Sequence, residues 1–201
     1  MELIKEQQAI VIIGGWNPSI FSPEWVSKYL FDGEKLKVEF PLNTSLPPRI
    51  SNEKMRLTVE ANKFNIIPIE ISDENYQNME DVIVKVIDYL PHTPVTALGV
   101  NFHFVDIENK VNTEILEILN SDVSDKVTGV LDQTTIKRAI REDDYILNME
   151  TIYHDSKTII NFNYHFNLNK ISGIKEKIDN NSIVSLKNKS MDILKKLHQT
   201  G

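Results

Sequence analysis

Two short stretches of the chain carry the same run of residue types: Asn, an aromatic residue, His and Phe. The first is residues 101–104 (NFHF) and the second is residues 163–166 (NYHF). Histidine titrates near neutral pH, so it is the natural residue for acid–base chemistry, and it also binds metals. Asparagine offers hydrogen-bond donors and acceptors without charge. The stretches predict a two-histidine site, an internal repeat, or two strands that each have one polar face.

Apolar and polar residues alternate along both stretches, which is typical of a strand with one face against a core. In the second stretch one face carries Ile160, Phe162, Tyr164, Phe166 and Leu168, and the other carries Asn161, Asn163, His165, Asn167 and Asn169. In the first stretch Leu98, Val100, Phe102 and Phe104 alternate with Ala97, Gly99, Asn101 and His103. The candidate binding residues are therefore Asn101, His103, Asn161, Asn163 and His165. Two alternatives stay open: both polar faces are solvated, or both line a shared groove or subunit interface.

The second stretch belongs to a predicted meander of three strands, TIKRAIRE (135–142), YILNMETIYH (145–154) and KTIINFNYHFNL (157–168). A two-residue turn at 155–156 would place Phe162 opposite Met149 in one apolar row. The other face would then pair Asn161 with Glu150, Asn163 with Asn148 and His165 with Ile146. By strand rise, Glu150 would lie about 13 Å from His165.

That separation argues against a metal site, because one ion could not bind both side chains. The chain has no Cys, so a zinc site would depend on His and carboxylate ligands alone. We expect no metal and no cofactor; Gly14-Gly15 follows an apolar run but lacks the further Gly of a dinucleotide-binding loop. The catalytic alternative is a hydrolase-type enzyme that uses His103 or His165 with Glu150 as acid and base.

The elements around these strands predict an α+β fold, with antiparallel sheets and helices on one face. The first half has the order strand, helix, three strands, helix, strand, which is ferredoxin-like with one added strand. Its stronger helix begins at residue 75 and stops at Pro91. The second half adds a short helix at 112–122, the meander and a C-terminal helix near 182–199. No Gly-, Ser- or Pro-rich linker divides the chain, which predicts a single domain, 1–201, of two packed lobes, about 1–110 and about 111–201.

Composition narrows the function classes. The chain has 201 residues, 41% of them hydrophobic, and a net charge of −7 without a basic stripe. We therefore expect no general nucleic-acid binding, which rests on neutralising phosphates. No segment is as long and apolar as a membrane span, and the first residues lack a secretory pattern. The prediction is a cytoplasmic protein without membrane contact.

Three segments together resemble a family of uncharacterised bacterial proteins. They are WNPSIFSPEW (16–25), which holds an Asn-Pro-x-Ile-Phe-x-Pro-x-Trp pattern, MRLTVEANKF (55–64), and LPHTPVTALGVNFHF (90–104), which holds His-Thr-Pro-Val. The resemblance covers about the first half of the chain, and INFNYHF (160–166) extends it into the second. Val100 stands where the family pattern has Ile, a conservative difference. The resemblance implies a folded bacterial module and no particular activity.

These observations favour a non-enzymatic binding or assembly module over an enzyme. The chain shows no catalytic constellation, and its Asn- and His-rich faces suit a ligand groove or protein contact. The expected partner is another protein or a second copy of the chain, since Ile146, Ile152 and Ile159 would form an apolar patch on the polar face. We interpret the protein as a protein–protein interaction subunit of a bacterial system. A role in phage defence is a hypothesis that the identity of the neighbouring genes would test.

Overall fold

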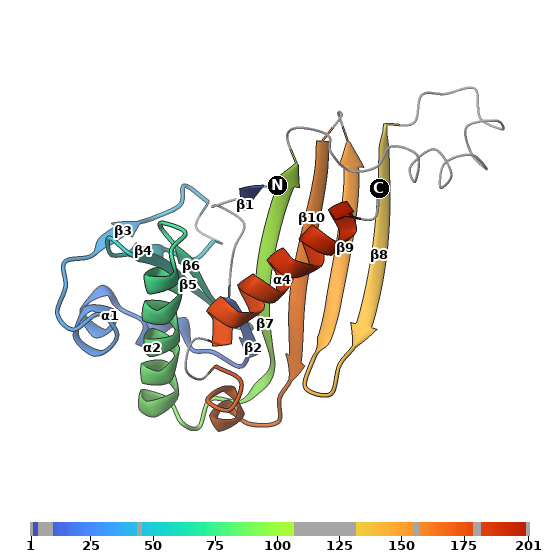
Figure 1. Ribbon diagram of the computed structural model, residues 1–201. Coiled ribbons are helices and arrows are strands. Elements are labelled where there is room, and N and C mark those ends of the chain that lie inside the picture. Colours follow the sequence, from blue (N-terminus) through green and yellow to red (C-terminus); the bar gives the residue numbers. More distant parts are fainter. Residues whose placement is uncertain are drawn as a thin grey trace.

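The computed structural model describes residues 2–3, 10–43, 46–106, 132–154, 157–178 and 182–199 (Figure 1). Its strands are β1 (Glu2–Leu3), β2 (Ile10–Gly14), β3 (Lys37–Glu39), β4 (Arg49–Ser51), β5 (Met55–Glu60), β6 (Lys63–Pro68), β7 (Val95–Asp106), β8 (Gln133–Arg141), β9 (Ile146–His154) and β10 (Lys157–Asn167). Its helices are α1 (Pro23–Tyr29), α2 (Asp73–Tyr89) and α4 (Ser182–Gln199), with 3-10 turns η2 (Pro18–Ile20) and η3 (Ile171–Ile174). The expected helix at 112–122 and turn at 155–156 lie outside the described residues.

The described strands form one antiparallel sheet in the order β3-β4-β5-β6-β2-β7-β10-β9-β8, with β1 paired to β7. Within it, β5-β6-β2-β7 has the ferredoxin-like strand order, with α1 between β2 and β5 and α2 between β6 and β7. The α+β prediction is therefore confirmed.

The added part of the first half has two strands, where the sequence predicted one. The second of them, β4, follows Pro47-Pro48, residues that are typical of a loop. It is a strand because Ile50 pairs with Val38 on one side and Leu57 on the other, and is only 3% exposed. A strand of three residues next to Pro47-Pro48 has too short an apolar pattern to be recognised from sequence.

The long strand β7 joins the two halves of the sheet. Its first residues pair with β2, where Val100 lies opposite Ile10, and Ala97 to Asp106 pair with β10. One connected hydrophobic core runs through both halves. The two expected lobes thus share a single sheet.

Helices α1 and α2 start where the sequence provides a cap. The Ser22 hydroxyl accepts a hydrogen bond from the Trp25 amide before α1, and Ser72 does the same for Asn75 before α2. The start of α4 is held from outside, because the buried carboxylate of Glu80 in α2 accepts a bond from the Ile183 amide at 2.7 Å. No helix of the described residues is long and apolar enough to cross a membrane.

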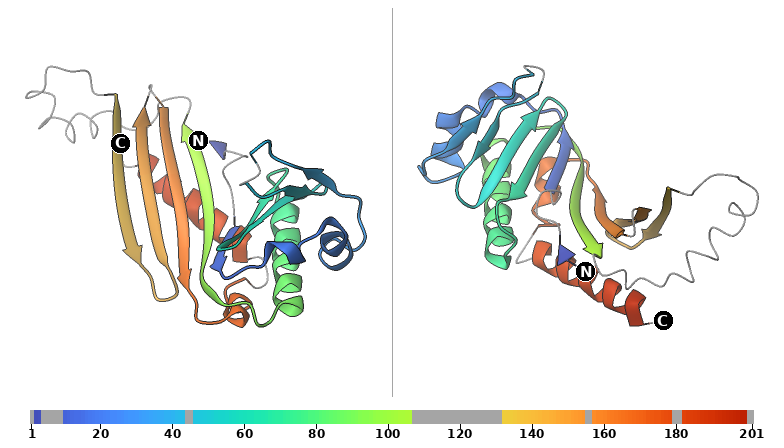
Figure 2. Two further views of the ribbon diagram at one scale, coloured as in Figure 1. Left: turned by 180° about the vertical axis from the view of Figure 1, so that it is seen from behind. Right: turned by 90° about the horizontal axis from the view of Figure 1, so that it is seen from above.

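Helices α2 and α4 contact each other and cover the same face of the sheet (Figures 1 and 2). Beneath them the aromatic residues of β7 and β10 pack edge to face, with ring centroids 5.7 Å apart for Phe104 and Phe162 and 6.1 Å for Phe102 and Tyr164. Phe162 and Tyr164 are fully buried and Phe166 is 4% exposed. The predicted alternation is confirmed, so the polar residues of these strands point to the opposite face.

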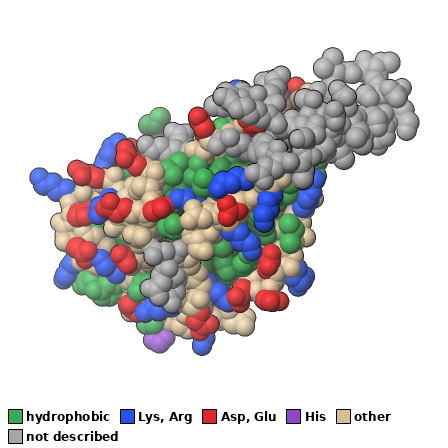
Figure 3. All heavy atoms as spheres, viewed as in Figure 1, with side chains coloured by type: hydrophobic (Ala, Val, Ile, Leu, Met, Phe, Trp, Pro, Cys, Tyr) green, Lys and Arg blue, Asp and Glu red, His purple; other side chains and the backbone are tan. Residues whose placement is uncertain are grey.

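The opposite face is concave. Seen from above in Figure 2, strands β7, β10, β9 and β8 curve away from α4, and no described helix lies inside the curve. On the helical side, acidic and basic side chains are interspersed over the described surface, with hydrophobic side chains between them (Figure 3). The concave side, which we call the polar face, carries the candidate residues.

Candidate functional site

Strand register brings one polar residue from each of four strands into line across the polar face. His103 of β7 lies opposite Asn161 of β10, Asn161 lies opposite Glu150 of β9, and Glu150 lies opposite Lys137 of β8. We call these four residues the histidine row. The pairing of Asn161 with Glu150 confirms the register predicted from the meander, whereas the pairing of β7 with β10 was not predicted.

Hydrogen bonds connect the histidine row from end to end. The His103 Nδ1 to Asn161 Oδ1 distance is 2.6 Å, and Asn161 Nδ2 donates to Glu150 Oε2 at 2.9 Å. Glu150 Oε1 in turn pairs with Lys137 Nζ at 2.9 Å. Asn161 and Glu150 are half-buried, while the side chain of Lys137 is 77% exposed. The row therefore runs from an imidazole on β7 to a solvated ammonium on β8.

The carboxylate fixes the orientation of every group in the row. An ionised Glu150 only accepts hydrogen bonds, so the side of Asn161 that faces it must be the NH2 group. The amide oxygen of Asn161 then faces His103, and Nδ1 of His103 must carry a hydrogen to donate to it. A neutral His103 is accordingly held as the Nδ1–H tautomer, with the lone pair of Nε2 free to act as an acceptor.

Glu150 remains ionised to lower pH than an ordinary glutamate. The hydrogen bond from Lys137 is the main cause of its lowered pKa, and the bond from Asn161 is the next; partial burial opposes both. The carboxylate form that fixes the row is thus the form that the row itself stabilises.

A second line of side chains runs beside the first. Asn163 lies opposite Asn101 on one side and Asn148 on the other, and Asn148 lies opposite Ala139 of β8. Asn148 Nδ2 donates to Asn163 Oδ1 at 2.9 Å, and Asn163 Nδ2 donates to Asn101 Oδ1 at 2.7 Å. We call Asn101, Asn163 and Asn148 the amide row.

Gly99 leaves room for this row. A Cβ at position 99 would lie 3.2 Å from Asn163 Nδ2, closer than the amide could accept without moving. The neighbour for which glycine leaves room at this position is therefore the amide of Asn163.

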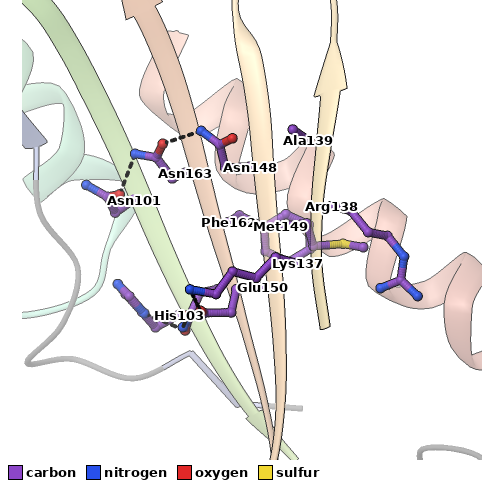
Figure 4. Close-up of a pocket in the computed structure, with 11 residues that line it drawn as sticks. Asn101, His103, Lys137, Arg138, Ala139, Asn148, Met149, Glu150, Phe162 and Asn163 are labelled. Carbon is purple, nitrogen blue, oxygen red and sulfur yellow. Dashed lines mark hydrogen bonds and ion pairs between the residues drawn. The ribbon is translucent and has the colours of Figure 1, made fainter. Parts of the chain in front are cut away.

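The two rows line one pocket with a volume of about 540 Å³, within the usual size range of ligand sites (Figure 4). Figure 4 shows the amide row and the histidine row side by side on the four strands, with Lys137 extending along the face and Arg138 pointing away from it. The pocket holds four of the five predicted site residues, Asn101, His103, Asn161 and Asn163, together with Glu150 of the enzyme alternative.

The fifth predicted residue, His165, does not join them. It lies opposite Gly99 and Ile146, and its Nε2 is 3.1 Å from Asn167 Oδ1. It lines a separate hollow with the acidic turn between β8 and β9, residues 142–144. The two histidines are therefore not partners. The reason is that His165 lies four positions beyond Asn161 along β10, and each strand residue advances about 3.3 Å.

The isoleucines predicted to form one apolar patch are also divided. Ile159 lies opposite Ile152 and Val105 next to the histidine row, whereas Ile146 lies opposite His165 at the other end of the amide row. All four are half-buried on the polar face. The apolar strip beside the pocket thus consists of Val105, Ile159 and Ile152.

Two residues of the pocket were missed by sequence reasoning. Lys137 was not proposed as a site residue, and Asn148 was paired with Asn163 but not proposed as one either. Both are placed by the β8–β9 and β9–β10 registers. Among the described residues, no three His, Asp or Glu side chains are close enough to hold a metal ion.

Comparison with known proteins gives no further guide to the chemistry. No protein-family model matches the chain, and no curated protein matches its sequence.

Proposed function

We propose that the protein is a non-enzymatic binding module that holds part of a partner protein on its polar face. The observation that carries this proposal is the pair of hydrogen-bonded rows in one concave pocket. Seven polar side chains from four strands are held in fixed orientations by one another: His103, Asn161, Glu150, Lys137, Asn101, Asn163 and Asn148. Side chains that are already ordered lose little entropy when a ligand binds, which favours affinity.

The chemistry of the rows suits an uncharged polar ligand. Glu150 and Lys137 neutralise each other at 2.9 Å, so the pocket has no strong net charge to attract an ion. Each primary amide has two N–H groups, and the rows use one N–H of Asn161, Asn163 and Asn148. The second N–H of each of these three amides can donate to a carbonyl or hydroxyl oxygen, and His103 Nε2 can accept from an N–H or O–H. Peptide groups of a partner offer this combination of donors and acceptors.

The apolar strip of Val105, Ile159 and Ile152 beside the pocket supports a protein as the partner. Protein interfaces combine apolar contact with about one hydrogen bond per 100–200 Å². The resemblance in residues 16–25 and 90–104 supports a bacterial system as the setting, and a second copy of the chain is one form that the partner can take.

A site-specific crosslink tests the proposal. Benzoylphenylalanine at Ala139, which lines the pocket, should capture one defined protein when irradiated in the native cell. The same residue at Asp81, exposed on α2 on the other side of the sheet, should not capture it. Asn148→Ala with Asn163→Ala should abolish capture at Ala139. Equal labelling from both positions, or capture that survives loss of the amides, would count against the proposal.

A second candidate is a hydrolase-type enzyme, favoured by the contact chain from Glu150 through Asn161 to His103. In this reaction Nε2 of His103 removes a proton from water, the water oxygen attacks an ester carbonyl carbon, and the proton passes to the leaving alkoxide. Purified protein would then hydrolyse p-nitrophenyl acetate faster than its His103→Gln variant, with a further decrease in Asn161→Ala relative to wild type. Equal rates for wild type and His103→Gln exclude this candidate for the ester.

A further inference from the structure

Strand β8 is the exposed edge of the sheet. Within the part of the chain that the structure describes, it pairs with β9 alone along all nine of its residues, and it ends the strand order (Figure 1). None of its residues is buried. An edge strand of this length presents unpaired backbone N–H and C=O groups to any strand that approaches it.

The side chains of this edge are basic, although the chain as a whole has a net charge of −7. Lys137, Arg138 and Arg141 are all exposed. Lys137 has Glu150 as a partner, whereas Arg138 and Arg141 form no ion pair with a described residue.

The acidic turn that follows β8 does not cancel this charge. Glu142 is paired with Lys189, and Asp144 is paired with Lys177, so Asp143 is the one carboxylate of this turn without an ion pair to a described residue. The two arginines of the open edge outnumber this single carboxylate, so a positive charge remains there.

This charge pattern disfavours pairing between two copies of β8. Full antiparallel overlap places Lys137 against Lys137 of the second copy, and a shift by two residues places Arg138 against Arg138. Like charges directly opposite each other destabilise a strand pair, and basic residues on edge strands commonly prevent self-association. The same residues would stabilise a strand that carries carboxylates.

We propose that β8 receives an acidic strand of a partner protein, which extends the sheet by antiparallel pairing. On the polar face, acidic residues of this strand lie opposite Lys137 and Arg141. On the face of α4, one acidic residue lies opposite Arg138 and apolar residues lie opposite Ile136 and Ile140. Ile140 is 43% exposed on that face, and an apolar neighbour on the added strand would bury more of it. Backbone hydrogen bonds supply affinity in this mode of recognition, and the side-chain pattern supplies specificity.

Lys137 and Arg138 also line the pocket, but this inference concerns the backbone edge of β8 and not the amide row, so it can fail while the proposed function stands. The probe is a nine-residue peptide, matched to the length of β8, with Glu opposite the three cations and Val opposite the two isoleucines. A twin peptide has Lys in place of each Glu. Binding to the full chain is measured by fluorescence anisotropy at low ionic strength, because exposed ion pairs are screened by salt.

We expect the acidic peptide to bind and the basic twin not to bind. Arg138→Glu with Arg141→Glu should weaken binding about tenfold or more. Each substitution replaces an attractive exposed ion pair with a repulsive pair, and the two effects add. Lys35→Glu with Lys170→Glu is the matched control, since it changes the net charge equally at two other exposed positions and should leave the affinity unchanged. Asn148→Ala with Asn163→Ala, which alters only the pocket, should also leave it unchanged.

Strand addition has a further signature that simple charge attraction lacks. Two versions of the acidic peptide are N-methylated, one at its odd-numbered residues and the other at its even-numbered residues. Because successive N–H groups of a strand point to opposite edges, each version loses the N–H groups of a different edge. One should bind like the parent peptide and the other about tenfold more weakly or worse. The proposal is overturned if the two N-methylated peptides bind with equal affinity or if the basic twin binds as well as the acidic peptide. It is also overturned if Lys35→Glu with Lys170→Glu weakens binding as much as the arginine substitutions do.

Discussion

The hydrogen bonds of the histidine row predict which tautomer neutral His103 adopts. Nδ1 of His103 lies 2.6 Å from an amide oxygen whose orientation is set by Glu150. The Nδ1–H tautomer makes a hydrogen bond there, whereas the Nε2–H tautomer would leave two acceptors facing each other. A flip of the Asn161 amide would only move the same conflict to Glu150, where the amide oxygen would meet a carboxylate oxygen.

The preference can be estimated from the contacts. A hydrogen bond is worth about 0.5–1.5 kcal/mol net, and an unsatisfied buried polar group costs about 1–3 kcal/mol. Because Asn161 is half-buried, the low end of both ranges applies, about 1.5 kcal/mol together, or a population ratio of about twelvefold. Neutral His103 should therefore be mainly the Nδ1–H form.

Long-range proton–nitrogen NMR separates protonated from unprotonated ring nitrogens, and His103→Gln identifies the signal among the five histidines of the chain. At a pH where the ring is neutral, wild type should show protonated Nδ1 and bare Nε2. Asn161→Ala should lose the preference, and Glu150→Gln should weaken it, because a glutamine can donate as well as accept and so permits the amide to flip. A dominant Nε2–H form in the wild type, or an unchanged spectrum in Asn161→Ala, would refute the reasoning.

Three further predictions concern stability. Phe162→Ala should lower the free energy of unfolding by about 3–5 kcal/mol in urea denaturation, with Asn163→Ala on the polar face losing clearly less. Because the pKa of Glu150 is lowered from 4.5, its contribution to stability is present above that value and is lost as pH falls through the lower folded pKa, so the stability gap between wild type and Glu150→Gln should shrink in acid. Burial raises the pKa of Tyr164 from 10.0 to about 12, so its contribution is full below pH 10.0 and is lost up to about pH 12; the stability of Tyr164→Phe should fall less steeply over that interval.

Local patterns in the sequence were sufficient to predict the meander. The alternation in 157–168 was long enough to place Phe162, Tyr164 and Phe166 in the core, and the short spacing between the two predicted strands was enough to predict the partners of Phe162 and Tyr164 in β9. Helix α2 was equally clear, because its apolar positions recur at helical spacing and a proline follows its last turn. The short strand β4 was not predicted. It has three residues, and its buried Ile50 is a single apolar residue between a proline pair and a turn.

The pocket could not be predicted because it depends on a strand pair distant in sequence. His103 and Asn161 are 58 residues apart, and nothing in either strand specifies that β7 and β10 are neighbours. Both histidine strands were seen to have a polar face, yet only the register decides which residues meet across it. The register puts His103 opposite Asn161 and His165 opposite Gly99, so His103 belongs to the histidine row and His165 does not.

The core residues that set this register also set the geometry of the polar face. Side chains alternate along a strand, so a slip of β10 by one residue would turn Phe162 and Tyr164 outward and bring the asparagines into the core. The edge-to-face contacts of Phe104 with Phe162 and of Phe102 with Tyr164 therefore hold the two strands in the one alignment that forms the histidine and amide rows. Position 163 lies between Phe162 and Tyr164, and position 161 directly precedes Phe162, so their amides are placed by packing on the other side of the same strand. A substitution that loosens that packing without unfolding the sheet should thus disturb the rows as well, although it touches no residue that a ligand in the pocket would contact.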